Sequence, residues 1–104
     1  MPNYILAYHG GKTPENPAEG AKHRGKFFAW ISGLGDVVVN PGTPLGMSKN
    51  VSSGGVSDND GSNRLTGFSV VKADSLDAAL EMAKGCPFLE IGTIEVAEVM
   101  EMEM

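Results

Sequence analysis

The two histidines are the side chains best suited by type to acid–base chemistry. His23 precedes Phe27 by four residues and Trp30 by seven, so on a helix these three side chains share one stripe. Because such a stripe faces the core, we expect His23 to point toward the sheet. A neutral imidazole near pH 7 can accept a proton in an elimination or isomerisation. A structural histidine bonded to a backbone carbonyl is the alternative.

His9 lies at the end of the first expected strand, close to where the following helix returns. If His9 and His23 line one cleft, the two imidazoles can share the acid and base roles. Two histidines without further ligands do not form a convincing metal site. The sequence therefore predicts neither a metal nor another cofactor.

The carboxylate that would partner His23 is less clearly marked. Asp36 is the obvious choice by sequence, but His23 lies roughly 13 Å before the end of the helix at the usual rise. The strand that follows returns at about 3.3 Å per residue, so Asn40 comes nearer to the level of His23. Asp36 is thus a catalytic candidate that more simply starts a strand. Asp58 or Asp60 would have to come from a loop or from a second subunit.

Further side chains are candidates for lining a substrate pocket. Tyr8 and Trp30 could stack on a ligand, and Arg64 could recognise a carboxylate. Trp30 fits the hydrophobic core equally well. Cys86 precedes a proline after a helix, and we expect it to be a buried structural thiol.

Composition limits the class of protein. A chain of 104 residues with 41% hydrophobic and 20% charged residues fits one folded domain, here residues 1–104. The net charge of -5 and the short basic cluster of Lys22, Arg24 and Lys26 argue against nucleic-acid binding. A single cysteine, the lack of a signal-like N-terminus and the lack of a membrane-spanning run predict a cytoplasmic protein without membrane contact.

Hydrophobic periodicity and turn residues predict the elements that position these side chains. The first helix has Asn16 as its cap, Pro17 at its first position and Glu19 to complete a capping box. Asp74 or Ser75 caps the second helix. In chain order, the prediction is a strand over 4–8, a helix over 17–33, strands over 36–40 and 45–51, a flexible loop over 52–63, a strand over 68–73, a helix ending at Gly85, and a strand over 93–99 with a bulge after Ala97.

This order of elements predicts an α+β fold. Each helix has one narrow apolar stripe, so both helices should cover the same face of a ferredoxin-like antiparallel sheet. The first strand is apolar on both of its faces, with Leu6 on one and Ile5 on the other. Since the second face also needs cover, the sequence predicts a homodimer.

The C-terminal half carries short motifs in a recognisable order. They are Thr66-Gly67-Phe68, then residues 73–79 (ADSLDAA), Cys86-Pro87 and residues 92–96 (GTIEV). With looser agreement over 4–8, 33–38 and 40–42, the chain resembles the YCII-related family, which includes the DGPF-type proteins. The stretch that corresponds to the DGPF motif reads DNDGSN over 58–63, and His9 stands where members often carry an acidic residue.

The resemblance implies a dimeric ferredoxin-like α/β barrel with a cleft between the first helix, the sheet and the partner subunit. Some members are similar to dehydrochlorinases or lyases of small ring compounds, a His/Asp-centred site has been proposed for others, and many have no known activity. His23 matches the helix histidine of that site. The expected function is a small-molecule lyase or isomerase whose cleft is closed by the loop over 52–63. A non-catalytic metabolite-binding or accessory dimer is the alternative, and a purely structural dimer is a third.

Overall fold

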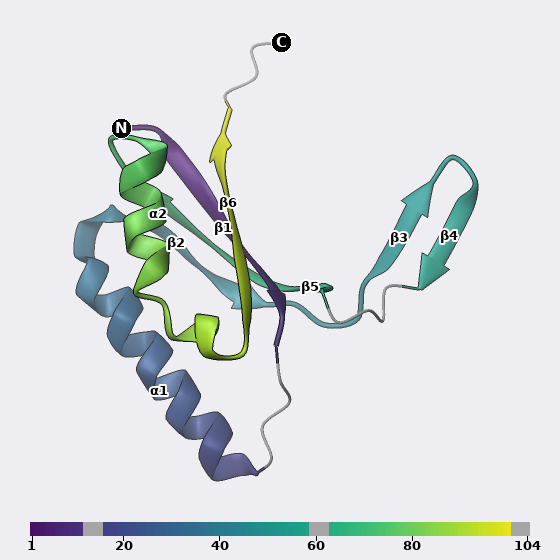
Figure 1. Ribbon diagram of the computed structural model, residues 1–104, viewed down its shortest axis with the longest axis horizontal. Helices are drawn as coiled ribbons and strands as arrows, with labels where there is room; N and C mark the ends of the chain where they lie inside the picture. Colours follow the sequence, from purple (N-terminus) through teal and green to yellow (C-terminus); the bar gives the residue numbers. More distant parts are fainter. Residues whose placement is uncertain (12–15, 59–62, 101–104) are drawn as a thin grey trace.

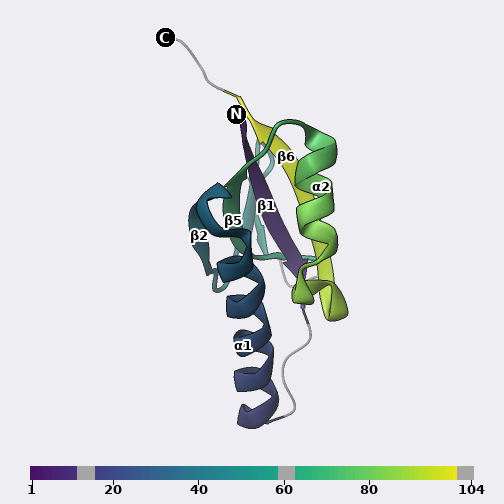
Figure 2. The same cartoon turned by 90° about the vertical axis from the view of Figure 1, so that its left-hand side faces the viewer.

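A computed structural model of the protein describes residues 1–11, 16–58 and 63–100. Its elements are β1 (Asn3–Gly10), α1 (Pro17–Leu34), the 3₁₀ turn η1 (Gly35–Val37), β2 (Val38–Pro44), β3 (Lys49–Ser52), β4 (Gly55–Asp58), β5 (Leu65–Lys72), α2 (Leu76–Lys84), the 3₁₀ turn η2 (Pro87–Glu90) and β6 (Gly92–Val99). Within these residues, four strands form an antiparallel sheet in the order β2-β5-β1-β6 (Figure 1). Both helices lie over one face of this sheet (Figure 2). The predicted ferredoxin-like α+β fold is confirmed.

The core lies between this sheet and the helices. Leu6 of β1 and Val71 of β5 have no exposed surface, and Ala79 and Ala83 of α2 pack against the same cluster. Small side chains on α2 let the helix approach the sheet closely. Burial of a leucine side chain such as Leu6 contributes about 2 kcal/mol, so this layer provides much of the driving force for folding.

Both helices begin at the caps that the sequence indicates. The side chain of Asn16 accepts a hydrogen bond of 2.9 Å from the backbone N–H of Glu19, and Pro17 is the first helical residue. In α2 the structure selects Ser75, whose hydroxyl accepts from the backbone N–H of Ala78 at 3.2 Å. Each cap satisfies a backbone donor that the first helical turn leaves without a partner.

Aromatic side chains join α1 and η2 to β1. The ring of Tyr8 lies 5.8 Å from that of Phe27 and 5.1 Å from that of Phe88, measured between centroids. Trp30 lies 5.6 Å from Phe27, and its indole N–H donates to the carbonyl of Met82 in α2 at 3.2 Å. These contacts hold α1 and α2 side by side on the face of the sheet to which Tyr8 points.

The second strand differs from its predicted limits. Asp36 lies in η1, and β2 begins at Val38 and continues through Pro41 to Pro44, so the predictions of a start at Asp36 and a stop at Pro41 are wrong. Proline is tolerated because β2 is an edge strand. The register against β5 shifts around Gly42, whose N–H is bonded by the side chain of Asn40 at 2.8 Å.

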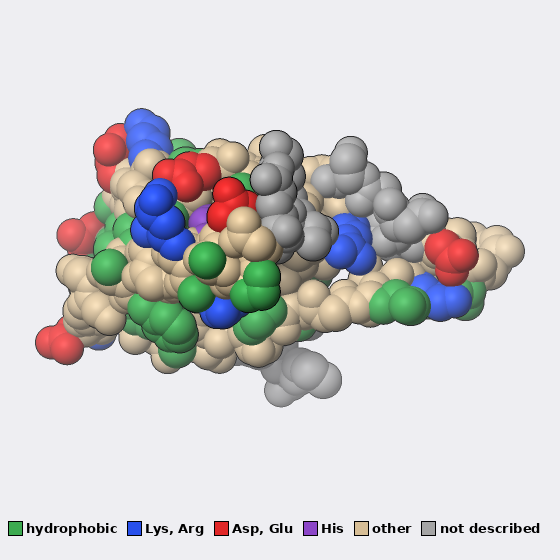
Figure 3. Space-filling model, turned by 90° about the horizontal axis from the view of Figure 1, so that it is seen from below, with side chains coloured by type: hydrophobic (Ala, Val, Ile, Leu, Met, Phe, Trp, Pro, Cys, Tyr) green, Lys and Arg blue, Asp and Glu red, His purple; other side chains and the backbone are tan. Residues whose placement is uncertain are grey.

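The predicted third strand and flexible loop are also corrected. Of the segment over 45–51, only residues 49–51 are in a strand, as part of β3, and this strand pairs with β4, which lies inside the expected loop. The two strands form a hairpin separate from the main sheet and project from the body of the molecule (Figures 1 and 3). Gly55, with a φ of 126°, allows the tight turn between the two strands. The loop-like composition of the segment gave no indication of this turn.

The predicted bulge after Ala97 is wrong, because the register of β6 against β1 is continuous over the whole strand. Ala97 and Val99 instead belong to the sheet surface that faces away from the helices. We call this surface the open face, and its apolar side chains are Ile5, Ala7, Phe68, Val70, Ala97 and Val99. The sheet is therefore apolar on both sides, as its alternating pattern indicates.

Candidate functional site

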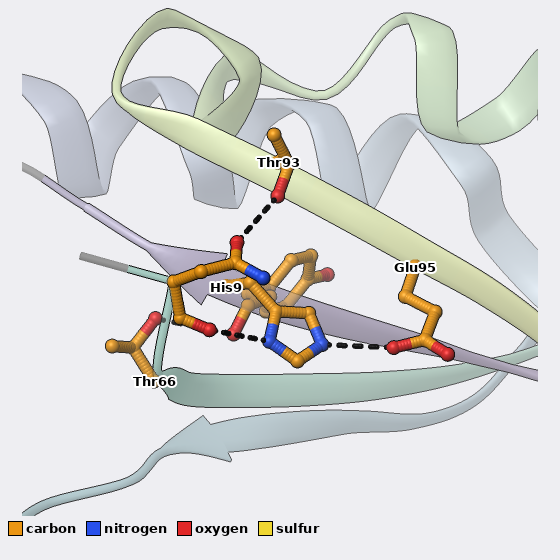
Figure 4. Close-up of polar contacts among 6 residues, drawn as sticks. His9, Thr66, Thr93 and Glu95 are labelled. Carbon is orange, nitrogen blue, oxygen red and sulfur yellow. Dashed lines mark hydrogen bonds and ion pairs between the residues drawn. The ribbon is translucent and has the colours of Figure 1, made fainter. Parts of the chain in front are cut away.

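A register shift at the end of β1 determines which residues of β5 lie beside His9. Tyr8 lies opposite Gly67 of β5, but His9 lies opposite Leu65, so Thr66 is the extra residue of a bulge. The hydroxyl of Thr66 donates to the carbonyl of Tyr8 at 3.2 Å. Because Tyr8 points into the core, His9 points to the open face (Figure 4). Bulges of this kind often redirect a side chain beside a functional site.

The segment that precedes β5 is fixed to His9. The carbonyl of Asn63 lies 3.1 Å from Nδ1 of His9, and the carbonyl of Arg64 accepts from the N–H of Gly10 at 2.8 Å. The hydroxyl of Thr93 donates to the side-chain oxygen of Asn63 at 3.4 Å. Bonds to both β1 and β6 thus hold the Asn63 carbonyl against the imidazole.

The second ring nitrogen of His9 meets a carboxylate. Nε2 of His9 lies 3.0 Å from Oε1 of Glu95, the pair shown in Figure 4. His9 faces Thr93 across the β1–β6 pair and Glu95 faces Ala7, so His9 and Glu95 are diagonal neighbours on the open face. The side chain of His9 is 20% exposed and that of Glu95 is 68% exposed. Solvent reaches the pair mainly through the carboxylate.

These contacts determine which ring nitrogens of His9 act as hydrogen-bond donors. A backbone carbonyl only accepts, so the Nδ1 of His9 must donate to Asn63. Nε2 then faces the carboxylate of Glu95, and a hydrogen bond between them requires one proton. With Nδ1 as a donor to Asn63, the proton of this second hydrogen bond is carried either by the imidazole or by the carboxyl group. We call His9, Glu95 and Asn63 the His9 site.

His23 lies elsewhere in the molecule. It is half-buried on α1, between the buried Gly20 and the half-buried Phe27, as its place on the apolar stripe predicts. It belongs to the helix layer, whereas His9 projects from the opposite face of the sheet. The structure does not bring the two histidines together within one chain, and the partners of His9 are Asn63 and Glu95.

The described carboxylates that were considered for His23 belong to other parts of the fold. Asp36 is exposed in η1, 13 positions along the chain from His23, or about 20 Å at the helical rise. Asp58 ends β4 and forms an ion pair of 3.1 Å with Lys49. Asp60 lies outside the described residues.

Two of the three expected pocket residues are core residues. Tyr8 is 5% exposed, its hydroxyl donates to Oγ of Ser69 at 2.7 Å, and burial raises its pKa to about 12. Trp30 is tied to α2 by its indole N–H. Arg64 is exposed and belongs to the segment that holds His9. Cys86 is buried as predicted, and burial raises its pKa to about 11, so it stays a thiol at neutral pH.

Three other features bear on the kind of site that the chain can hold. Within residues 1–11, 16–58 and 63–100, no group of three or more His, Cys, Asp or Glu side chains is arranged to hold a metal ion. No helix there is long and apolar enough to cross a membrane.

A hollow of about 250 Å³ lies between the two ends of the chain, apart from the His9 site, and is lined by Met1, Pro2, Asn3, Glu98, Val99 and Met100.

Glu95 and Asn63 are members of the site that sequence reasoning missed. The alternation of β6, with Ile94 and Val96 packed on the core, does indicate that Glu95 points outward. That pattern alone does not say which strand lies beside β6 or in which register. The partner of His9 therefore became visible only with the fold.

Comparisons with known proteins agree with this architecture. The sequence matches the YCII-related domain over residues 9–103. The fold is similar to that of a 5-chloro-2-hydroxyhydroquinone dehydrochlorinase from Burkholderia phenoliruptrix, solved in complex with 2,5-dihydroxybenzoquinone, with a TM-score of 0.55 and 15% sequence identity over 90% of each chain. No curated protein matches the sequence.

Proposed function

This chain belongs to the YCII-related family, and from that premise we propose that it is a small-molecule enzyme of the lyase or isomerase type. One observation carries the proposal: Nε2 of His9 lies 3.0 Å from the carboxylate of Glu95, while the carbonyl of Asn63 lies 3.1 Å from its other ring nitrogen. A histidine oriented by a second group is a common arrangement for proton transfer. The sequence favoured His23, but the contacts of His9 make it the better candidate.

Such a pair suits the removal of a proton next to a carbonyl group. The exposed carboxylate of Glu95 accepts the proton from carbon, and the Nε2–H of His9 donates a hydrogen bond to the enolate oxygen that forms. In an elimination, the electron pair then expels the leaving group. In an isomerisation, Glu95 returns the proton to a different carbon. Asn63 acts as a positioning residue because it orients the ring through Nδ1.

The similar dehydrochlorinase suggests a class of substrate. That enzyme acts on a chlorinated hydroxyhydroquinone and was solved with a dihydroxybenzoquinone. We extend the class to this chain as hydroxylated ring compounds with a carbonyl or enol group. Their oxygen atoms could accept from His9, and their flat faces could lie on the apolar open face beside it.

We also propose that the enzyme is a cytoplasmic homodimer that forms through the open face. This surface carries Ile5, Phe68 and Val70, and burying it in a dimer would shield apolar area on both copies. The His9 site lies at one end of the same surface. Dimerisation would therefore turn an exposed pair into a cleft.

Proton exchange tests the proposed activity even where the product of the reaction is not identified. The wild-type protein is incubated in D₂O with a panel of hydroxyquinols, hydroxyquinones and cyclic diketones, and loss of carbon-bound protons is followed by ¹H NMR. We expect at least one compound to exchange faster than in protein-free buffer. If no compound exchanges although one binds, the catalytic proposal fails.

The alternative is a non-catalytic metabolite-binding or accessory dimer. It is favoured by the fact that protein acceptors already occupy both ring nitrogens of His9. In this alternative, ligands bind saturably and leave unchanged, so calorimetric titration with recovery of intact ligand identifies it.

A further inference from the structure

The β3–β4 hairpin is poorly stabilised by its own chain. Every residue of its two strands is exposed. Val51 and Val56 lie opposite each other, with 79% and 65% of their surfaces exposed. Lys49 and Asp58 pair at its base at 3.1 Å. A two-stranded hairpin is only marginally stable alone in water, so a further surface should cover this one.

The position of the hairpin does not agree with the expectation that this segment closes a cleft of its own chain. The sequence predicts that the segment over 52–63 folds over a cleft beside α1, but the hairpin projects away from the body (Figures 1 and 3). The radius of gyration is 15.0 Å, compared with about 13 Å for a compact domain of this length. The hairpin thus extends beyond its own domain.

The distribution of charge in the chain indicates which kind of partner could contact the β3–β4 hairpin. The chain has a net charge of -5, yet residues 41–58 contain only two charged side chains, Lys49 and Asp58, which are of opposite sign and pair with each other. An acidic second copy can approach this segment without the repulsion that the rest of the surface would exert. Nucleic acids and anionic membranes would be repelled by the protein as a whole. Among these partners, another copy of this chain fits best.

The same chain also carries a surface that can receive the hairpin. The open face is apolar, and the His9 site lies at the end where β5 begins. The hairpin leaves the domain at this end, because Asn63 follows the hairpin closely in sequence and bonds to His9. A twofold arrangement can therefore place each hairpin over the open face of the other copy.

We propose that the β3–β4 hairpin is an exchanged arm whose Val51 and Val56 pack on the open face of a second copy and cover that copy's His9 and Glu95. The proposal rests on the homodimer proposed above and adds what each copy contributes to the other's site. The arm excludes water from an acid–base pair that is otherwise exposed through Glu95.

Photo-cross-linking between isotopically distinct copies tests the arm without any substrate. p-Benzoylphenylalanine replaces Val51, and ¹⁵N-labelled and unlabelled chains are mixed before irradiation and mass spectrometry. We expect mixed-isotope cross-links from position 51 to peptides of β1, β5 or β6. The control is the same substitution at Phe28, which is 64% exposed on α1 and should not reach the open face. Links confined to one chain, links to the helices or no links would each overturn the proposal.

Sedimentation separates the arm from the dimer itself. Replacing Val51 and Val56 with serine removes two apolar side chains from the interface, and we expect the dimer dissociation constant to rise about tenfold or more. The control is Leu76→Ser, an exposed residue of α2. If the double variant dimerises as tightly as the wild type, the arm proposal fails while the proposed homodimer and the proposed activity remain open to their own tests.

Discussion

Replacing His9 with glutamine is expected to lower kcat/KM by about 10²- to 10⁴-fold on any compound that the protein turns over. Glutamine can keep a hydrogen bond to the Asn63 carbonyl, but it cannot exchange a proton with Glu95 or with a substrate as the imidazole does in the proposed reaction. His9 lies at the end of β1 with 20% of its side chain exposed, so the fold should persist. Turnover by both proteins is measured in the D₂O exchange assay, with circular dichroism to check folding.

The matched control is His23→Gln, which removes the other imidazole of the chain. His23 lies in the helix layer away from the His9 site, and we expect this variant to keep wild-type turnover within a few-fold. Glu95→Gln should lose activity as His9→Gln does, because it removes the proton acceptor. A protein that loses activity on replacement of His23 and keeps it on replacement of His9 would return the catalytic role to the helix histidine.

A large effect on stability is expected from Gly42→Ala, with a loss of about 2–4 kcal/mol in the free energy of unfolding. Gly42 has a φ of 82°, which disfavours any residue with a Cβ, and that Cβ would overlap the backbone carbonyl of Phe68. The position of this Cβ is fixed by the backbone of residue 42, and the carbonyl belongs to the backbone of β5. A side-chain rotation therefore cannot relieve the clash. The edge strand β2 must separate from β5, and the hydrogen bond from Ser69 to the Pro41 carbonyl would be lost with it.

Urea unfolding followed by circular dichroism measures this loss, and Gly46→Ala is the control. A Cβ at Gly46 would meet no atom within 4 Å, and its φ lies outside the region that favours glycine. We expect Gly46→Ala to change stability by less than about 0.5 kcal/mol. Equal midpoints for the two variants would show that β2 and β5 do not approach each other closely at Gly42.

The elements with strong local signals could be predicted from the sequence. The caps Asn16 and Ser75 and the apolar stripes of both helices give the two helices, and from their order the ferredoxin-like fold. The hairpin was missed because a segment rich in Ser, Gly, Asp and Asn is typical of loops, and Val51 and Val56 alone are too few for a periodic pattern. The extended β2 was missed because proline normally ends strands that lie inside a sheet.

The candidate site was predictable only in part. His23 has a clear helical signal, and the structure places it on the expected stripe. The environment of His9 depends on long-range pairing, since Glu95 lies 86 positions away and Asn63 lies 54 positions away in the sequence. The β1–β6 register and the bulge at Thr66 decide these neighbours, and neither follows from local propensity. The alternation of apolar and polar residues along a strand indicates which face of the sheet a side chain points to. It does not indicate which residue of the neighbouring strand lies beside that side chain.

The tautomer of His9 tests the central claim most directly. Long-range ¹H–¹⁵N NMR of the imidazole, at a pH high enough that the ring carries a single proton, reports which nitrogen holds it, with His9→Gln used to assign the signals. Donation to the Asn63 carbonyl predicts the proton on Nδ1, the less common tautomer of free histidine, so that the proton on Nε2 is the one that the ring exchanges with Glu95 and donates to a substrate. A proton found on Nε2 instead would mean that Asn63 does not hold the ring through Nδ1, and the proposed proton transfer would lose its geometric basis.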